Sequence, residues 1–394
     1  MSNPASKPSV LIIGGLGFIG RYLAKYIYDN DLASEIKIVD KQLPQLAWLA
    51  PEFETACSME RFQQADMSRE QTCEKVFSRP DGSTWDYVFN CGGDTRYCQQ
   101  DEIYKQRSLK LSVVAGKEAA KRGVKFFVEL STGAIYKPES TPTKETAKIK
   151  PWLKLAKYKL QAENELQKIP GLNLVIVRMA NVYGEYCSKL VGTMLCMARV
   201  YKELDREMKW LWTKDLKSNT VHVKDVARAL WHVSQWYVNG KENWDERSMG
   251  ETPVFNIVDE GDTDQGILSE FMASIFQIKT GFHGTLVSQI ARLNLGSAVD
   301  EENDELLQPW GDLLNQYNIT RPGPITPYLE GDTIKDCDFC LDGSRFREIT
   351  KFEYSVPKVT EECLREIIDS YGRMNWWPPM DGAPKAAQIE QATT

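Results

Sequence analysis

The chain has 394 residues, of which 42% are hydrophobic and 26% are charged, a composition typical of a globular protein with a large buried core. Its net charge of −7, without any long block of Lys and Arg, argues against a nucleic-acid-binding protein. No apolar run approaches the roughly 18 residues of a membrane-spanning helix, and the opening MSNPASKPSV lacks the pattern of a secretory signal. We therefore expect a cytoplasmic protein with no membrane span and no nucleic-acid partner.

Short apolar runs alternate with amphipathic segments through the first half of the chain. The apolar runs predict strands at SVLIIGG (9–15), IKIVD (36–40), YVFNCGG (87–93), KFFVEL (125–130) and LNLVIVRM (172–179), and QQADMS (63–68) ends a further strand. The amphipathic segments predict helices at 21–31, 109–123 and 158–169. Apolar strands that alternate with helices are typical of a parallel sheet covered on both faces. The sequence therefore predicts an α/β fold with a doubly wound parallel sheet.

The character of the sequence changes after about residue 185. A long amphipathic segment (189–212) is followed by short apolar runs at 218–230 and 252–261, an acidic stretch with prolines (299–332) and a closing helix (358–374). We expect a nucleotide-binding domain at 1–185, to which residues 219–260 return. Residues 186–218 and 261–380 would form a smaller, interleaved C-terminal substrate lobe, and residues 381–394 a disordered tail.

The cysteines do not indicate disulfides or a metal centre. Nine cysteines, an odd number spread over a long chain, predict reduced thiols. Cys337 and Cys340 have the spacing of half a zinc site, but the three histidines are isolated from one another. The surrounding IKDCDFCLD (334–342) also predicts a strand, in which residues three apart point to opposite faces. We therefore expect no metal site.

A glycine-rich turn follows the first predicted strand and opens the first helix. Gly14, Gly17 and Gly20 have the spacing that lets a tight turn and a helix N-terminus approach a pyrophosphate, although such turns also occur for structural reasons alone. Asp40 ends the next strand, where a carboxylate meets the adenosine ribose and would repel a 2′-phosphate. The sequence therefore predicts a dinucleotide site that favours NAD over NADP, and the neighbouring Lys41 works against that preference.

Six motifs in order extend the pattern along the chain. They are GGLGFIG (14–20), ADMS (65–68), FNCGGDTRY (89–97), LSTGAIY (130–136), RMANVYG (178–184) and NTVHVKDVA (219–227). With these motifs the sequence resembles the extended short-chain dehydrogenase/reductase family, the NAD-dependent epimerase/dehydratase group, which has a Rossmann nucleotide-binding domain.

The resemblance implies roles for individual residues. The cofactor positions of the family fall on Gly14, Gly15, Gly17, Phe18, Ile19, Gly20, Asp40, Lys41, Asp66, Met67, Cys91, Gly92, Gly93 and Lys159. Its substrate positions fall on or near Asp94, Arg96, Tyr97, Tyr136 and Asn181. Thr132 falls on the Ser/Thr that holds the substrate oxygen.

The family's catalytic tyrosine is missing from this chain. In the family, a Tyr four residues before a Lys shares its helical face, and the ammonium lowers the pKa of the phenol. KLQAE (159–163) aligns Lys159 with that lysine and places Leu155 at the tyrosine position. The only Y-x-x-x-K of the chain, YSVPK (354–358), contains a proline and lies in the C-terminal part, so we regard it as a chance match. The family's proton relay also uses an Asn near the start of the preceding helix, and Leu109 stands at that position in this chain.

Two explanations of the missing tyrosine stay open. One is a replacement donor: Tyr158 is adjacent to Lys159, and the other candidates are Tyr136, Tyr97, Asp94 and Thr132. The other explanation is a loss of chemistry, with NAD kept as a ligand. Several candidates also have purely structural interpretations, because Thr132 would cap a turn, Tyr158 would be a packing residue, and Arg178 and Asn181 would be hydrogen bonders at a strand end.

The resemblance implies an NAD(P)-dependent oxidoreductase or an epimerase/dehydratase-type enzyme. It would act at a hydroxyl or carbonyl carbon of a small organic substrate, in the cleft between the lobes, with a non-standard proton donor. Family members pair through two helices, so we also expect a homodimer. The main alternative is a catalytically silent NAD-binding regulator or assembly subunit, and a weaker one is a lyase or isomerase without redox chemistry.

Overall fold

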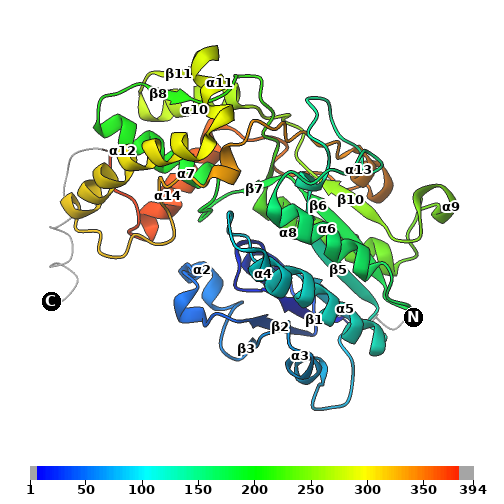
Figure 1. Cartoon of the computed structure of the whole chain (residues 1–394). Coiled ribbons are helices and arrows are strands. Elements are labelled where there is room, and N and C mark those ends of the chain that lie inside the picture. The colour runs from blue at the N-terminus through cyan, green and yellow to red at the C-terminus, as the bar shows by residue number, and fades with distance from the viewer. Residues whose placement is uncertain (1–6, 381–394) are drawn as a thin grey trace, which may run out of the picture. The chain divides into compact units, whose positions relative to one another are not determined.

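Residues 7–380 are described here by a computed structural model, in which the chain divides into two units (Figure 1). Unit 1 comprises the chain up to Val182 together with Asn219–Asp262 and Cys337–Lys358. Unit 2 comprises Tyr183–Ser218, Thr263–Asp336 and the chain from Val359 onward. No helix within residues 7–380 is both long and apolar enough to cross a membrane.

The centre of unit 1 is a seven-stranded sheet in the order β10-β6-β5-β4-β1-β2-β3, in which every pair is parallel. Its strands are β1 (Ser9–Ile13), β2 (Glu35–Asp40), β3 (Phe62–Gln64), β4 (Tyr87–Asn90), β5 (Phe126–Thr132), β6 (Leu174–Met179) and β10 (Val254–Ile257). The strand order reverses between β1 and β4, as in a doubly wound Rossmann sheet. The predicted fold class is therefore confirmed, and each predicted strand of the first half is present.

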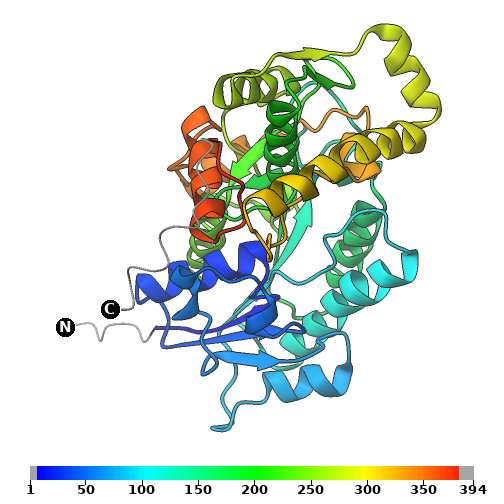
Figure 2. The ribbon, with the colours of Figure 1, turned by 90° about the vertical axis from the view of Figure 1, so that its left-hand side faces the viewer.

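Helices cover both faces of this sheet, which explains why its strands are almost continuously apolar. On one face α1 (Phe18–Asp29) packs against α8 (Val223–Val238), and on the other α5 (Leu111–Lys121) packs between α3 (Glu70–Phe77) and α6 (Lys154–Leu166) (Figures 1 and 2). All residues of β1, β4 and β6 are buried. The remaining helices of unit 1 are short: α2 (Pro51–Glu54), α4 (Asp101–Tyr104), a π-helix (Lys105–Lys110), α9 (Glu246–Met249), α13 (Ser344–Thr350) and two 3-10 helices (Pro44–Leu46 and Gly133–Ile135).

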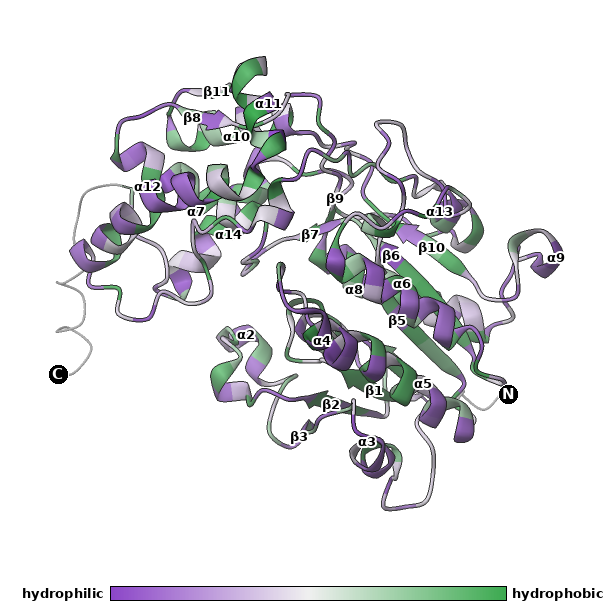
Figure 3. Cartoon of the chain, in the orientation of Figure 1, coloured by the Kyte–Doolittle hydropathy of each residue, from purple (hydrophilic) through white to green (hydrophobic). Residues whose placement is uncertain are grey.

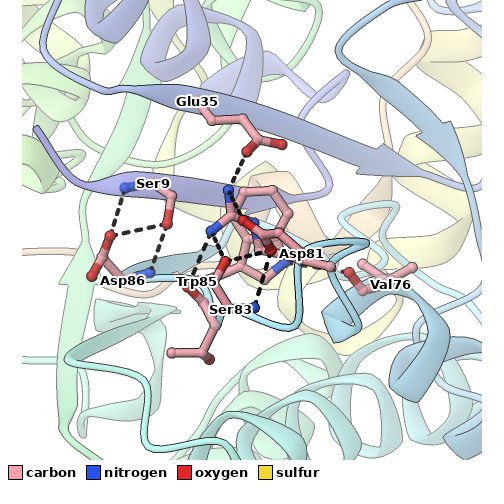
Figure 4. A network of polar contacts seen from close by, with 9 residues as sticks. Ser9, Glu35, Val76, Asp81, Ser83, Trp85 and Asp86 are labelled. Atoms are coloured by element: carbon pink, nitrogen blue, oxygen red, sulfur yellow. Dashed lines mark hydrogen bonds and ion pairs between the residues drawn. The ribbon is translucent and has the colours of Figure 1, made fainter.

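Polar pairs close the amino-terminal edge of the sheet (Figure 4). The carboxylate of Asp86 accepts hydrogen bonds from the N–H and the hydroxyl of Ser9, at 2.8 and 3.0 Å, and lies 2.8 Å from the Lys125 ammonium. The guanidinium of Arg79 pairs with Glu35 at the start of β2. At the opposite, carboxyl-terminal edge the strands run into the glycine-rich segments, so the two edges of the sheet differ in chemistry.

Two expectations about the second half of the sequence are wrong. Residues 334–342 form no continuous strand, because they bond to loops rather than to a neighbouring strand: Thr143 N donates to Cys340 O at 3.1 Å, and Leu341 forms an isolated bridge with Thr143. Asn219 also exchanges hydrogen bonds with this segment, donating to Phe339 O and accepting from Leu341 N, both at 2.9 Å. These bonds place residues 337–358 in unit 1, whereas the sequence assigned them to the C-terminal lobe.

None of the nine cysteines, all of which lie within residues 7–380, forms a disulfide. The expected tail at 381–394 lies outside the described residues.

Unit 2 is mainly helical. It contains α7 (Val191–Glu203), α10 (Gln265–Phe276), α11 (Thr285–Leu293), α12 (Leu295–Gln316), α14 (Glu361–Arg373) and a parallel pair of strands, β8 (Met208–Trp210) and β11 (Thr280–Phe282). Aromatic rings fill its core: the ring of Trp377 lies 5.7 Å from that of Tyr371, 6.0 Å from that of Trp310 and 6.3 Å from that of Phe276. The short strand β7 (Asn181–Tyr183) pairs with β9 (Thr220–His222).

Candidate functional site

The turn after β1 fits closely between the ends of β2 and β4. The N–H groups of Gly14 and Gly15 both donate to Val39 O, at 2.7 and 3.3 Å, which fixes the turn on β2. Gly14 has φ +70°, and a Cβ added to it would lie 2.7 Å from the backbone of Gly92, which follows β4. Glycine is therefore required here, both for the backbone conformation and for the approach of the two segments.

The same turn leaves the start of α1 open to a ligand. Gly17 is exposed, takes the N-cap position in an extended conformation and has no side chain with which to cap the helix. A Cβ on Gly20 would lie 2.4 Å from Gly14 O, so this glycine allows close packing of turn and helix. Phe18 and Ile19 are half-buried in the first turn. Backbone N–H groups at such an uncapped start are ready-made donors for a phosphate.

Asp40 is held at the end of β2 by the same turn. Its carboxylate accepts N–H hydrogen bonds from Leu16 at 3.2 Å and from Gln42 at 3.1 Å. Burial raises the pKa of Asp40, although those hydrogen bonds and the charge of Arg21 oppose the shift. Lys41 turns instead to Asp66, with its ammonium 3.3 Å from the carboxylate.

Asp66 is fixed in turn by its own loop. Its carboxylate accepts hydrogen bonds from the N–H and hydroxyl of Ser68, at 3.1 and 2.7 Å, and the neighbouring Met67 is buried. The structure thus brings Asp40, Lys41 and Asp66 together on the side of the sheet next to the glycine turn.

The segment after β4 lies above the ammonium of Lys159. Lys159 Nζ donates to Gly92 O at 3.3 Å, and a Cβ on Gly93, which has φ +141°, would lie 3.3 Å from Nζ. Cys91 ties the end of β4 to β1, because its N–H donates to Ile13 O at 2.9 Å. The predicted cofactor residues at 91–93 and at 159 are therefore adjacent to one another and to the glycine turn.

A buried carboxylate that the sequence analysis missed lies beneath Lys159. Glu129, on β5, is 3.2 Å from Lys159 Nζ and accepts further hydrogen bonds from Asn90 Nδ2 at 2.5 Å and Ser112 Oγ at 2.8 Å. Burial raises the pKa of Glu129, and the Lys159 charge and the hydrogen bonds oppose the shift. A glutamate inside an otherwise apolar strand was the signal available in the sequence, since carboxylates are almost never fully buried without a partner.

Tyr158 is turned away from Lys159. Its ring stacks on that of Tyr104, with 6.0 Å between the centroids and 24° between the planes. Burial and the nearby Asp101 carboxylate raise the pKa of Tyr158. Leu155, at the tyrosine position of the family, is half-buried near the start of α6. The contacts of Tyr158 therefore match the packing role rather than the proton-donor role.

Asp94 and two arginines form an ionic cluster after β4. The Asp94 carboxylate accepts from Arg96 Nε at 2.9 Å and from Arg107 Nη1 at 3.1 Å, while its N–H donates to Ser108 Oγ at 3.1 Å. Burial acts to raise the pKa of Asp94, but the hydrogen bonds and charges of Arg96 and Arg107 prevail and lower it. Asp94 is then ionised near neutral pH and is a poor proton donor. Tyr97 is half-buried in the same loop.

Three other candidates hold hydrogen bonds within unit 1. Thr132 Oγ1 accepts from Ala134 N at 3.2 Å and so caps the turn after β5. Tyr136 is buried, with its hydroxyl 2.8 Å from Asn256 Oδ1, and burial raises its pKa to about 12. The side chain of Asn181 donates to Asn219 O at 3.0 Å.

A second buried network lies close by on β5, α6 and β6. Arg178 Nη2 donates to the Glu163 carboxylate at 2.6 Å, Ser131 donates to the same carboxylate, and Arg178 Nη1 donates to the hydroxyl of Tyr136 at 2.8 Å. Glu163 is fully buried. This network fixes Tyr136 in the interior, so its hydroxyl is already committed to protein partners.

A family model matches the chain in sequence, and solved structures match it in fold. A family model described as "NAD dependent epimerase/dehydratase family" matches residues 10–249. No curated protein sequence matches the chain.

Solved structures of the same fold cover almost the whole chain. UDP-glucose 4-epimerase from Thermotoga maritima, solved with UDP-glucose, has a TM-score of 0.62 and 19% identity over 93% of this chain and 99% of that one. UDP-N-acetylglucosamine 4-epimerase from Methanobrevibacter ruminantium M1, solved with UDP-N-acetylmuramic acid, has a TM-score of 0.62 and 16% identity over 94% and 99%. MoeE5, solved with UDP-glucuronic acid and NAD, has a TM-score of 0.62 and 14% identity over 93% and 99%. At these identities the likeness establishes the fold.

Proposed function

Because the chain belongs to the NAD-dependent epimerase/dehydratase family, we propose that it binds NAD(H) at the carboxyl-terminal edge of the unit 1 sheet. We further propose that it acts as an NAD(P)-dependent oxidoreductase or epimerase/dehydratase-type enzyme at a hydroxyl or carbonyl carbon of a small organic substrate. The observation that carries the proposal is the fit of the Gly14 turn against Gly92, with the Lys159 ammonium directly beneath Gly93.

Two contacts support NAD rather than NADP. The Asp40 carboxylate lies beside the glycine turn, where it would accept a ribose hydroxyl and repel a 2′-phosphate. Lys41, a nearby residue whose charge would favour a phosphate, is paired with Asp66 at 3.3 Å. Its positive charge is therefore partly satisfied within the protein.

The proposed roles follow the family where the residues match it. Gly14, Gly17 and the start of α1 would hold the diphosphate, Asp40 the adenosine ribose and Lys159 the nicotinamide ribose. Bound there, a nicotinamide supplies a hydride acceptor or donor at carbon. Thr132 would hold the substrate oxygen, and the proton donor is non-standard: Tyr97 and Thr132 remain as candidates, whereas the contacts of Tyr158, Tyr136 and Asp94 argue against those three.

The main alternative is a catalytically silent NAD-binding regulator or assembly subunit. It is favoured by one observation: the helical face that presents Lys159 carries Leu155 and no phenol, while the neighbouring phenol of Tyr158 packs elsewhere. Both proposals share the cofactor site and differ only in whether chemistry takes place after the cofactor has bound. We also propose a cytoplasmic homodimer formed through helices, as the family pattern implies, and a substrate-binding role for unit 2.

Titration calorimetry with NAD, NADH and NADP tests the shared cofactor site, and Gly17→Ala provides the variant. The added methyl would lie 3.1 Å from Gly14 O, at the helix start where the diphosphate is expected. We expect NAD and NADH to bind more tightly than NADP. Gly17→Ala should weaken NADH binding by about tenfold or more, because its methyl group would keep the diphosphate away from the backbone N–H groups at the start of α1.

Gly372→Ala in α14 is the matched control, because its Cβ would meet no heavy atom within 4 Å, and it should leave the affinity unchanged. Folded protein without a measurable heat of binding for any of the three nucleotides would contradict the proposal. Turnover of NAD with a panel of secondary alcohols and UDP-sugars then separates the enzyme from the silent alternative.

A further inference from the structure

A fully buried carboxylate and the ammonium of Lys159 form an ion pair inside unit 1. The side chain of Glu129 is 0% exposed and that of Lys159 is 9% exposed, and the two charged groups are 3.2 Å apart. Asn90 donates to Oε2 of the carboxylate, and Ser112 and Lys159 both donate to Oε1. Both oxygens of the carboxylate therefore have partners, and all of these partners come from β4, α5 and α6.

Stability of the sheet does not explain this ion pair. Burying two charges costs about as much as their attraction returns, so a buried pair stabilises a fold little compared with apolar residues of similar volume. The neighbours of Glu129 along β5, Val128 and Leu130, are apolar and buried, and a third apolar side chain would continue their pattern. What a buried ion pair does provide is a fixed position for the charged groups.

The ion pair with Glu129 fixes the position of the Lys159 ammonium. An ammonium group has three N–H donors. One donates to Glu129 and one to Gly92 O, so a third is left for a ligand on the side of Gly93. In the family arrangement a phenol would lie beside this ammonium, but here Leu155 occupies that place and can make no hydrogen bond.

We propose that Glu129 is a positioning residue, which holds the ammonium of Lys159 at the nicotinamide ribose in the absence of the catalytic tyrosine. The proposal rests on the proposed NAD site and adds to it a residue outside the family motifs. An ammonium already paired with a carboxylate lowers the pKa of a neighbouring hydroxyl less than an unpaired one does. A lysine paired in this way is better suited to binding a ribose hydroxyl than to lowering the pKa of a catalytic acid.

ADP and ADP-ribose together test this role without any need for a substrate. ADP ends at the diphosphate, whereas ADP-ribose also carries the ribose that Lys159 would contact. For Glu129→Gln, which keeps the size of the side chain and removes its charge, we expect the Kd of ADP-ribose to rise about tenfold, because one charge-assisted hydrogen bond is weakened. The Kd of ADP should stay within about twofold of the wild-type value, because no contact to the diphosphate changes.

Three further variants make the result specific. Lys159→Met should weaken ADP-ribose binding in the same way, and adding Glu129→Gln to it should have little further effect, because both changes act through one contact. Glu163→Gln is the matched control, because this carboxylate is equally buried but is paired with Arg178. In this variant the ratio of the Kd of ADP-ribose to the Kd of ADP should stay at the wild-type value. Ser112→Ala removes one hydrogen bond to the Glu129 carboxylate and should raise the Kd of ADP-ribose by a smaller factor. This variant replaces Glu129→Gln in the test if Glu129→Gln does not fold.

The possible outcomes are distinct. An equal loss of ADP and ADP-ribose binding in Glu129→Gln would indicate general damage to the site and would overturn the positioning role. Unchanged ADP-ribose binding in both Glu129→Gln and Ser112→Ala would overturn it too. Wild-type protein that binds ADP but gains nothing from the added ribose would leave the diphosphate site intact and refute the role of Glu129. Wild-type protein that binds neither ligand nor NAD would refute the proposed function itself, and the positioning role with it.

Discussion

Leu155 and Lys159 occupy one face of α6, four residues apart, and this pair decides what chemistry the site supports. A hydroxyl at position 155 would lie beside the ammonium, which is the arrangement that transfers protons in the family. The side chain of Leu155 is half-buried and makes no polar contact that a substitution would break. The position is therefore suited to a gain-of-function experiment.

Leu155→Tyr should raise NAD-dependent turnover of a secondary alcohol or UDP-sugar by about tenfold to a hundredfold, at or below the low end of the usual worth of a positioned acid or base, because Lys159 is already paired with Glu129. The measurement is the initial rate of NADH formation across a substrate panel. Leu155→Phe adds the same ring without the hydroxyl and should give no gain. Equal rates in the two variants would show that the phenol finds no partner at Lys159, and would favour the silent alternative.

At the scale of single elements, α11 in unit 2 exposes its large apolar residues, whereas an ordinary surface helix buries them. Its small residues Ser288 and Ala291 are buried, whereas its large apolar residues face solvent. The exposed fractions are 71% for Leu286, 60% for Ile290 and 89% for Leu293. Figure 3 shows this helix largely in the colour of hydrophobic residues. Such a face contributes nothing to folding but favours self-association.

Replacing Leu286, Ile290 and Leu293 together by Ser should change the free energy of unfolding by less than about 1 kcal/mol, because little buried apolar surface is lost. The variant should also bind less of a hydrophobic dye and elute more sharply in size-exclusion chromatography. Ala291→Asp, on the buried side of the same helix, should destabilise the protein by about 1–3 kcal/mol, since it buries an unpaired charge. A large loss of stability in the triple variant, measured by urea unfolding, would mean that this face is covered.

The π-helix at Lys105–Lys110 explains why one residue could not be placed from the sequence. Counting back along the sequence from EAAKRGV (118–124) put the polar relay position on Leu109, and the wider turn of the π-helix changes which side chains of this segment face the glycine segment. Ser108 is the residue next to the glycine segment: its hydroxyl accepts from Asp94 N, and a Cβ on Gly93 would lie 3.4 Å from it. The π-helix spans six residues, fewer than the roughly 11 to 18 over which apolar periodicity is read, so the sequence pattern did not show the change of pitch.

At the scale of the whole molecule, stability should depend on pH through Asp259. This carboxylate follows β10, is buried, and accepts hydrogen bonds from Thr220 Oγ1 at 2.7 Å and Gly261 N at 3.0 Å. Burial raises its pKa to about 6, and the nearby charges of Asp225 and Glu260 act in the same direction. The native state therefore binds this proton more tightly than the unfolded state. The stability it contributes is complete below the unfolded pKa, about 3.9, and is lost as the pH rises through about 6.

Asp259→Asn should remove that pH dependence. Relative to the wild type, its free energy of unfolding should increase by roughly 2–3 kcal/mol between pH 4 and pH 7, measured by urea unfolding at a series of pH values. Asp304→Asn, at an exposed position of α12, is the control and should follow the wild-type curve. A constant difference between Asp259→Asn and wild type over this range would contradict the assignment.

The sequence predicts the parallel sheet and the glycine-rich turn after its first strand well, because these depend on local patterns: apolar runs, helical periodicity and glycines at fixed spacing. It predicts the second half poorly. The motif at 218–230 contains β9 and the first half of the sixteen-residue helix α8, and the first part of the acidic stretch, from 299 to 316, lies in α12, which continues through Pro309. Tertiary packing rather than local propensity decides these elements, as it decides that residues 337–358 join unit 1 and that Glu129 pairs with Lys159.

The discontinuous build of unit 1 has a consequence for its synthesis on the ribosome. Its glycine loop emerges first, but Phe339 and Leu341, which cover Gly133 after β5, and Cys340, which pairs with Thr143, emerge only after most of unit 2. A nascent chain therefore carries an uncovered patch beside β5 while some two hundred further residues are translated. A chain cut short before this stretch would retain every strand of the central sheet and still lack the segment that covers the end of β5 in unit 1.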